Sequence, residues 1–403
     1  MKKFLRKVYN ICIKHFLPQS IRQKLKQADS IEYPIIKRPD EFFEKVYHIK
    51  DATWETMTQP ETYHLLKQWT LSQYHPAQDI LQIDDCSIRC NSDTVETKGG
   101  IVWDKAYMDI FSKMVPMDED ILQHTLNEVW IRNAQKRIII KGECVSLLGV
   151  FATIWAHFLV QFLPKLYYAE EAGLLDGNVT VILPKYTDDH VKEMVQDVLD
   201  RHPNVKKYEV EDMHRVDIHC ERLFYIPTAS TLCNHAEWVA PYDIVIPQRA
   251  IDVLQKKLIK PLIEKAKGMP STYDKIYLVR RGMRSMSNMD EVEKYFKEQG
   301  FYFVEPHKMS LIEKVSLFQY AKIIVGPHSS AWTNIIFCNN SKGLMFTPLC
   351  RTMDAYLGYI NKLGMSKLLM LTGDDISQST HTDYCISIEK IDEAYKQLIG
   401  AQV

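Results

Sequence analysis

Short apolar segments alternate with segments of helical periodicity along most of the chain, and this alternation predicts parallel β-sheets covered by helices. The pattern is most regular after residue 270, where strands recur about every 25 residues, as right-handed crossovers of a Rossmann-like sheet require. The strands expected there are 275–279, 301–304, 323–325, 344–346 and 368–371. The helices expected there are 288–299, opened by a capping box of Asn288 and Glu291, and 311–321, 329–338, 354–363 and 388–399.

The same alternation runs through residues 136–245 and predicts a second, doubly wound parallel sheet. Its expected strands are 137–140, 179–184 and 222–227, and its expected helices are 188–200 and 151–172, the latter kinked at Pro164. Residues 30–135 are less regular, with short strands expected at 32–39, 79–89 and 97–103 and a helix at 118–133. We therefore expect an α/β protein with one Rossmann-like domain over 29–245 and another over 246–403.

The first residues of the chain form a separate unit. Residues 1–27 contain eight Lys or Arg side chains and no acidic residue, and their apolar positions recur at i, i+3 and i+4. This pattern predicts a basic amphipathic helix, appended to the domains over residues 1–28. Such a helix can lie in the interface of an anionic membrane or pack on the protein's own surface, and the sequence leaves both alternatives open.

The composition of the chain argues against several classes of protein. The chain has 403 residues and a formal net charge of −1, so it lacks the basic excess of a nucleic-acid-binding protein. Its nine cysteines are scattered without a CxxC pair, which argues against both a disulfide framework and a zinc site. The most apolar stretch, 147–168, is interrupted by His157, Gln161, Pro164 and Lys165, so no membrane span is expected. Without a signal peptide, these features predict a reduced, cytoplasmic protein.

Polar residues follow three successive strands of the C-terminal domain, and ligands of open parallel sheets bind at that edge. Arg280 and Arg284 follow the first strand, Glu305 follows the second, and His328, Ser329 and Ser330 lead from the third into a helix. Arginines and a helix N-terminus bind phosphate oxygens, and a strand-end carboxylate can accept ribose hydroxyls. The edge therefore predicts a diphosphate site. It contains neither GxGxxG nor GxxxxGK[ST], which leaves NAD binding unsupported and excludes a Walker-type ATPase.

Each of these residues also has a purely structural explanation. The arginines can be solvated, Asn288 and both serines can cap helices, and Glu305 can belong to a turn. His157, within an apolar helix, is either a buried core residue or a general base. Asp118-Glu119-Asp120 resembles a metal-binding DxD motif, but an acidic helix start explains it better.

Three C-terminal segments together resemble the signature of glycosyltransferase family 61. They are YLVRRGMRSMSNMDE at 277–291, GFYFVE at 300–305 and AKIIVGPHSSAWTNIIF at 321–337. The segment HFLVQFLPKLYYAEEAG at 157–173 is similar to the family's N-terminal motif, a His followed by a Leu-Pro-x-Leu run. The resemblance covers about residues 130–350.

The resemblance implies a GT-B architecture, in which two Rossmann-like domains face each other across a cleft. It implies a metal-independent, inverting glycosyltransferase without a cofactor, which moves a sugar from a nucleotide-sugar donor, usually a UDP-sugar, to a glycan or lipid-linked glycan. Bacterial relatives work in capsule, lipopolysaccharide or other surface-polysaccharide assembly. If the basic segment 1–27 binds an anionic membrane, this cytoplasmic protein would lie peripherally on the inner face of the cytoplasmic membrane. By position, the diphosphate would contact Arg280, Arg284 and His328, Glu305 would contact the nucleoside, and Asn288 and Asn334 would brace the loops.

The turn after the third strand departs from the family pattern. The family has His-Gly-Ala-Gly-Leu-Thr-Asn, whereas this chain has His328-Ser-Ser-Ala-Trp-Thr-Asn334 and so lacks both glycines. This departure and the basic helix motivate a second hypothesis, a catalytically silent nucleotide- or glycan-binding subunit of an assembly complex. A third hypothesis keeps the fold and makes the protein a polyol-phosphate transferase.

Overall fold

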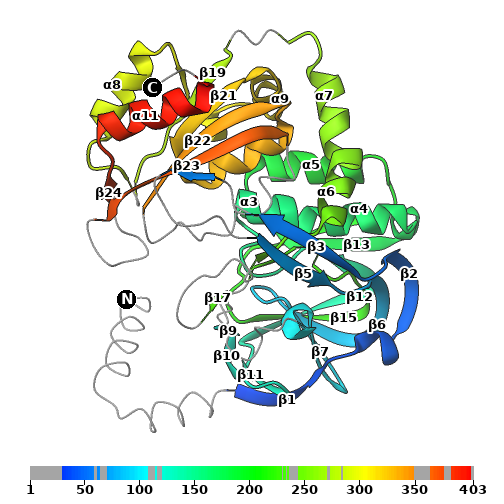
Figure 1. The fold of residues 1–403 in the computed structure, drawn as a ribbon. Helices are drawn as coiled ribbons and strands as arrows, with labels where there is room; N and C mark the ends of the chain where they lie inside the picture. The colour runs from blue at the N-terminus through cyan, green and yellow to red at the C-terminus, as the bar shows by residue number, and fades with distance from the viewer. Residues whose placement is uncertain are drawn as a thin grey trace, which may run out of the picture.

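The computed structural model describes residues 30–58, 61–63, 70–107, 114–115, 120–228, 230–232, 234–235, 244–269, 273–282, 285–348, 364–375 and 383–400. The predicted helices 1–28 and 354–363, and Arg284, lie outside these residues. Two large sheets lie at opposite ends of the molecule, and helices α3 (Trp155–His157), α4 (Leu163–Glu171) and α5 (Asp189–Leu199) lie between them (Figure 1). The protein is therefore a mixed α/β structure.

The C-terminal sheet is parallel through its central five strands, in the order β20-β19-β21-β22-β23. Their bounds are Tyr302–Val304, Lys275–Leu278, Ile323–Pro327, Ser341–Pro348 and Met365–Asp375. Alternate residues of the strands pack against helices on opposite faces, as the two-residue period of a strand requires. Helices α8 (Met289–Glu298) and α11 (Ile388–Ile399) cover the face of Tyr277, and α9 (Leu311–Tyr320) covers the face of Ile276. The predicted alternation of strands and helices is confirmed here.

Two details of this domain differ from the predictions. Residues Ser330–Phe337 form a 3₁₀ helix, η9, rather than an α-helix; the β-branched Thr333, Ile335 and Ile336 disfavour the wider helix. The predicted capping box at Asn288 is wrong, because its side chain does not cap α8 and its Nδ2 donates a hydrogen bond to Ile386 O at 2.7 Å.

The N-terminal sheet is mixed rather than parallel throughout. Its strand order is β10-β11-β1-β8-β7-β6-β15-β12-β13-β14, and β2 (Glu44–Lys50) pairs with β6. Only β15, β12, β13 and β14 form the parallel succession expected from residues 136–245, and β6 joins them antiparallel. The bounds in the order of the sheet are Ile121–His124, Glu128–Arg132, Ser30–Ile36, Gly100–Trp103, Thr94–Thr97, Gln78–Arg89, Val216–Tyr225, Lys136–Ser146, Val179–Pro184 and Lys206–Val210. Among the described residues, six short strands pair in twos outside it: β3 (Thr53–Thr58) with β5 (Thr70–His75), β9 (Met114–Val115) with β17 (Asn234–His235), and β16 (Thr231–Leu232) with β18 (Ile244–Val245).

The predicted helix over 118–133 is wrong for its described residues. They form the antiparallel hairpin of β10 and β11, which continues into β1. Val129 and Ile131 are buried two residues apart, so the apolar period is that of a strand. The interpretation of Asp120 as part of an acidic helix start fails with it, and Asp120 is itself buried before β10, where burial raises the pKa of its carboxyl group.

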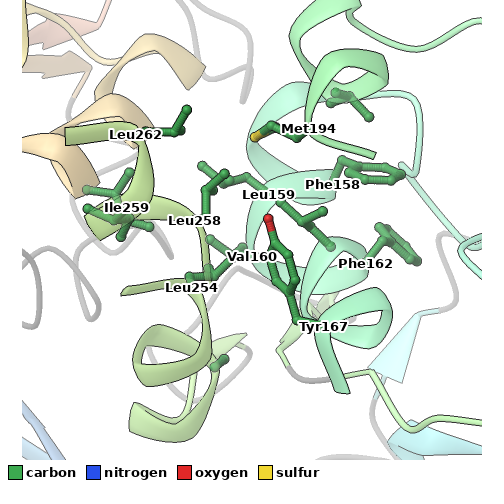
Figure 2. Close-up of a cluster of buried hydrophobic side chains, with 14 of the residues drawn as sticks. Phe158, Leu159, Val160, Phe162, Tyr167, Met194, Leu254, Leu258, Ile259 and Leu262 are labelled. Carbon is green, nitrogen blue, oxygen red and sulfur yellow. The ribbon is translucent and has the colours of Figure 1, made fainter. Parts of the chain in front are cut away.

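The helix expected over 151–172 begins at Trp155 and is interrupted. A π-helical segment, η4 (Phe158–Phe162), separates α3 from α4, and Pro164 lies in the first turn of α4. A proline cannot donate the hydrogen bond of a regular helix interior, so the break is at the expected place. Leu159 and Val160 on η4 face Leu254 and Leu258 on a second interrupted helix (Figure 2). That helix comprises α6 (Gln248–Leu254), the π-helical η7 (Gln255–Ile259) and α7 (Lys260–Ala266).

One apolar core joins the two sheets. It includes Phe158 and Val181 from the N-terminal part and Phe318 and Ile324 from the C-terminal part. The chain also crosses the expected boundary at residue 245, because β4 (Glu61–Tyr63) adds a parallel strand beside β23 in the C-terminal sheet. The two sheets are therefore packed as one body through shared helices.

Candidate active site

Three predicted site residues lie at one edge of the C-terminal sheet. Glu305, Arg280 and His328 lie at or just beyond the carboxyl ends of β20, β19 and β21, which are adjacent parallel strands. Neighbouring strands are about 4.8 Å apart, so the three positions span about 10 Å of the edge. The structure thus brings these residues together as the sequence predicted, while Arg284 lies outside the described residues.

Arg280 and its neighbour Arg281 are in different environments. Arg280 is half-buried, and its Nη1 donates a hydrogen bond to His328 O at 2.8 Å, which joins the ends of β19 and β21. Arg281 is exposed and forms a two-pronged ion pair with Glu293, with Nη2 at 3.0 Å from Oε2. Arg280 therefore points to the strand ends, whereas Arg281 is committed to α8.

The backbone of the turn after β21 has a conformation that Ser329 can adopt without strain. Ser329 has φ −160° and ψ 168°, an extended conformation that any residue adopts, so no glycine is needed at this position. Its Oγ is buried without a hydrogen-bond partner among the described residues, as is Oδ1 of Asn334. Nδ2 of Asn334 donates to Ala331 O at 2.8 Å within η9, whereas Ser330 is exposed. The turn presents a buried hydroxyl group at the start of a helix.

Glu305 and Asn288 form hydrogen bonds with residues outside the turn after β21. Glu305 Oε1 accepts a hydrogen bond from Lys308 Nζ at 2.8 Å, and this contact lowers the pKa of the carboxyl group. It is therefore an ionised acceptor at the strand end. The hydrogen bond from Asn288 Nδ2 to Ile386 O ties the loop before α8 to the segment that follows β24 (Tyr384–Cys385).

His157 belongs to a chain of hydrogen bonds that sets its tautomer. Gln161 Nε2 donates to Ser230 O at 3.1 Å, which turns the amide oxygen Oε1 toward His157. His157 Nδ1 is 2.8 Å from that oxygen, and because an amide oxygen only accepts, Nδ1 carries the proton. In the neutral ring the lone pair is then on Nε2. This is the arrangement that a general base requires.

The two halves of the predicted site meet between the sheets. Helix α3, which carries His157, lies against η9, which follows the His328 turn. His157 is 8% exposed, and its ring lies 4.7 Å from that of Phe151, a non-glycine residue with φ 68°. Such left-handed backbone costs about 1–3 kcal/mol and persists where the surrounding structure imposes it. The ring of His157 is therefore held against a residue of strained backbone, on a helix that packs against η9.

Sequence analysis missed a buried lysine at this junction, which packs against Trp155 and His190. Lys314 Nζ lies 4.3 Å from the ring centroid of Trp155 and 3.4 Å from Nδ1 of His190. The other ring nitrogen of His190 is 2.7 Å from Met309 O, so these contacts connect α5 to the start of α9. Lys314 is 2% exposed and occupies the buried face of α9 between Leu311 and Phe318, where periodicity calls for an apolar residue. A lysine at an apolar position of this helix was the signal in the sequence that could have revealed the buried Lys314.

We expect Lys314 to make stability depend on pH. Burial lowers the pKa of Lys314 from 10.5 to about 8, against the opposing charges of Asp188 and Glu193. Between these values the unfolded chain binds more protons than the folded protein, so the free energy of unfolding rises with pH. Urea denaturation of the wild type and Lys314→Met between pH 7 and 9.5 should show the wild type gaining stability relative to the variant. Parallel pH profiles would contradict a charged, desolvated Lys314.

A comparison with known proteins finds a family match over the residues that carry this site. Residues 155–345 match the family model of glycosyltransferase 61. The match begins at α3 and ends within β22, so it includes His157, Arg280, Glu305 and His328. A search of curated proteins found no significant match. The glycosyltransferase 61 domain supports glycosyltransferase activity for this chain.

Two further observations concern membranes and metals. Among the described helices, none is long and apolar enough to cross a membrane. Within the same described part of the chain, no group of three or more His, Cys, Asp or Glu side chains could hold a metal ion. At the carboxyl edge, the described candidates for contacting a diphosphate are Arg280, His328 and the turn at Ser329.

Proposed function

We propose that the protein is a metal-independent, inverting glycosyltransferase of GT-B architecture that uses a nucleoside-diphosphate sugar, with UDP as the first nucleotide to test. The observation that carries this proposal is that α3, which bears His157, contacts η9, the helix that begins after the His328 turn bonded by Arg280. The glycosyltransferase 61 match covers both sides of this junction. The acceptor is a glycan or lipid-linked glycan, and surface-polysaccharide assembly is the process proposed for it.

The reaction is a single displacement. An acceptor hydroxyl attacks the anomeric carbon, its oxygen–carbon bond forms as the bond to the diphosphate breaks, and the hydroxyl proton passes to Nε2 of His157. The leaving diphosphate gains negative charge. Arg280, His328, the Ser329 hydroxyl and the N–H groups at the start of η9 stabilise that charge by hydrogen bonds that are in place before the reaction.

The donor is tested by a calorimetric and thermal-shift screen of nucleoside diphosphates and their sugars, with EDTA throughout. A nucleotide at 100 times its dissociation constant should stabilise the protein by about 2.7 kcal/mol. Ser329→Ala should weaken binding of that nucleotide about tenfold, because it removes a hydroxyl without other partners. Arg281→Ala is the control and should leave affinity unchanged, because Arg281 is paired with Glu293. Failure of every nucleotide to bind would reject the donor site and favour the silent-subunit hypothesis.

A further inference from the structure

A cavity of about 430 Å³ lies within the N-terminal part, apart from the carboxyl edge described above. It opens among the ends of β1, β8 and β15, the start of β6 and helix α6. Its volume is within the usual range of about 300–1,000 Å³ for small-molecule sites. Its walls combine three aromatic rings with several polar side chains, and the aromatic residues are Tyr74, Trp103 and Tyr225.

Three buried side-chain oxygens in its walls have no hydrogen-bond partner among the described residues: the acceptor oxygens of Gln78 and Asp104, and the hydroxyl oxygen of Thr228. Gln78 is 2% exposed, and its Nε2 donates to Pro227 O at 2.8 Å, while its Oε1 has no hydrogen-bond partner among the described residues. Asp104 is 9% exposed, and its Oδ2 accepts from Thr228 N at 2.6 Å, while its Oδ1 likewise has no described partner. A buried acceptor without a donor is costly, so the oxygens of Gln78 and Asp104 indicate a ligand that donates hydrogen bonds.

The chemistry of the walls selects among ligands. A fully ionised phosphate cannot donate a hydrogen bond to the unpartnered oxygens of Gln78 and Asp104, although Lys37, Arg38 and Arg249 also line the cavity. A purely apolar ligand would leave the acceptors of Gln78 and Asp104 unsatisfied. A sugar ring has hydroxyl donors at its rim and an apolar C–H face that packs on aromatic rings, so it matches both kinds of wall.

The cavity is connected to His157 by a short piece of backbone. Thr228, which forms part of the wall, donates its N–H to Asp104, and Ser230, two residues later, accepts from Gln161 in the His157 chain of hydrogen bonds. Two residues span at most about 7 Å, so the wall of the cavity and the supports of His157 are direct neighbours. A sugar in the cavity would therefore lie near the candidate general base.

We infer that this cavity binds a saccharide unit of the acceptor, with Asp104 and Gln78 accepting hydrogen bonds from its hydroxyl groups and the aromatic residues packing on its face. The assignment of the sugar to the acceptor rests on the proposed function. Burial raises the pKa of Asp104, and the charge of Lys165 opposes that shift. Hydrogen bonds from sugar hydroxyls would, like the charge of Lys165, lower the pKa of Asp104 and stabilise its ionised carboxylate.

The test measures binding of methyl glycosides of glucose, galactose, mannose, xylose, rhamnose and N-acetylglucosamine to the full-length protein by saturation-transfer NMR, without nucleotide. Asp104→Asn keeps an oxygen for the Thr228 N–H and turns the unpartnered acceptor into a donor. We expect it to weaken binding about tenfold or more. Tyr74→Ala removes a ring that is 44% exposed, so it should fold and weaken binding several-fold. Asp176→Asn and Tyr186→Ala are matched exposed controls and should bind as the wild type does.

Two outcomes would overturn the inference: no glycoside binds, or binding is the same in Asp104→Asn and Tyr74→Ala as in the wild type. The result is separable from the proposed function. Glycoside binding lost in both variants, in a protein that binds no nucleotide, would keep the cavity as a sugar site and reject the transferase. Conversely, an active transferase whose acceptor KM is unchanged by Asp104→Asn would keep the function and reject the cavity.

Discussion

Replacing His157 by alanine is expected to lower turnover of the sugar transfer about 10²–10⁴-fold, because the attacking hydroxyl then loses its proton acceptor. Affinity for the donor nucleotide should stay within about twofold, since His157 lies on α3 and its hydrogen bond to Gln161 is made within the N-terminal part of the chain. The measurement is kcat for transfer, with nucleotide affinity determined by calorimetry on the same preparation. A loss confined to kcat separates a catalytic role from a structural one.

The controls for His157 use the hydrogen bonds that orient it. His219→Ala changes a histidine paired with Asp85 outside the site, so its activity should equal that of the wild type. Gln161→Met keeps the volume of the side chain but removes the oxygen that holds the proton on Nδ1. Its kcat should fall less than that of His157→Ala, with a changed pH profile. If His157→Ala turns over within a few-fold of the wild type, His157 is a buried core residue and another group is the base.

Gly326→Ala is expected to destabilise the protein by about 3–5 kcal/mol, combining backbone strain with overpacking. Gly326 has φ +153°, and a Cβ there would lie 2.6 Å from Leu278 O, a backbone atom of the neighbouring strand β19. Neither strand can move away without separating the end of β21 from that of β19, where Arg280 and His328 are joined. Nucleotide affinity should therefore fall together with stability.

Gly300→Ala is the matched control for this substitution. Gly300 ends α8 with φ +78°, and a Cβ there would meet nothing within 4 Å. It should therefore cost only the left-handed conformation, about 1–2 kcal/mol, and leave nucleotide affinity unchanged. Urea denaturation at pH 7 measures both variants. Equal losses would show that crowding against Leu278 plays no part at Gly326.

The C-terminal half was predictable because its signals are local. Each strand there is a short apolar run and each helix has its own amphipathic period, so α8, α9 and α11 begin and end within two residues of their predicted bounds. Parallel strands then place their carboxyl ends at one edge whatever the details of packing. That rule alone brought Arg280, Glu305 and His328 together.

The details that failed depend on neighbours distant in sequence. The hairpin of β10 and β11 has a helix-compatible composition, but its strands are stabilised by pairing with β1, about 100 residues earlier. Asn288 has a capping sequence, yet its amide binds Ile386, which tertiary packing brings beside it. A single sequence carries no direct record of such contacts.

The sequence by itself determined the alternating order of elements, the carboxyl edge of the C-terminal sheet and the chemistry gathered there, because period and propensity act over a few residues. Tertiary structure decided the rest: the mixed N-terminal sheet, the crossing of β4, the buried Lys314 and the tautomer of His157. It also formed the cavity and its unpartnered buried oxygens, from segments as far apart as Gln78 and Thr228. Burial and partner choice are properties of the packed chain, so they became visible only when distant segments were brought into contact.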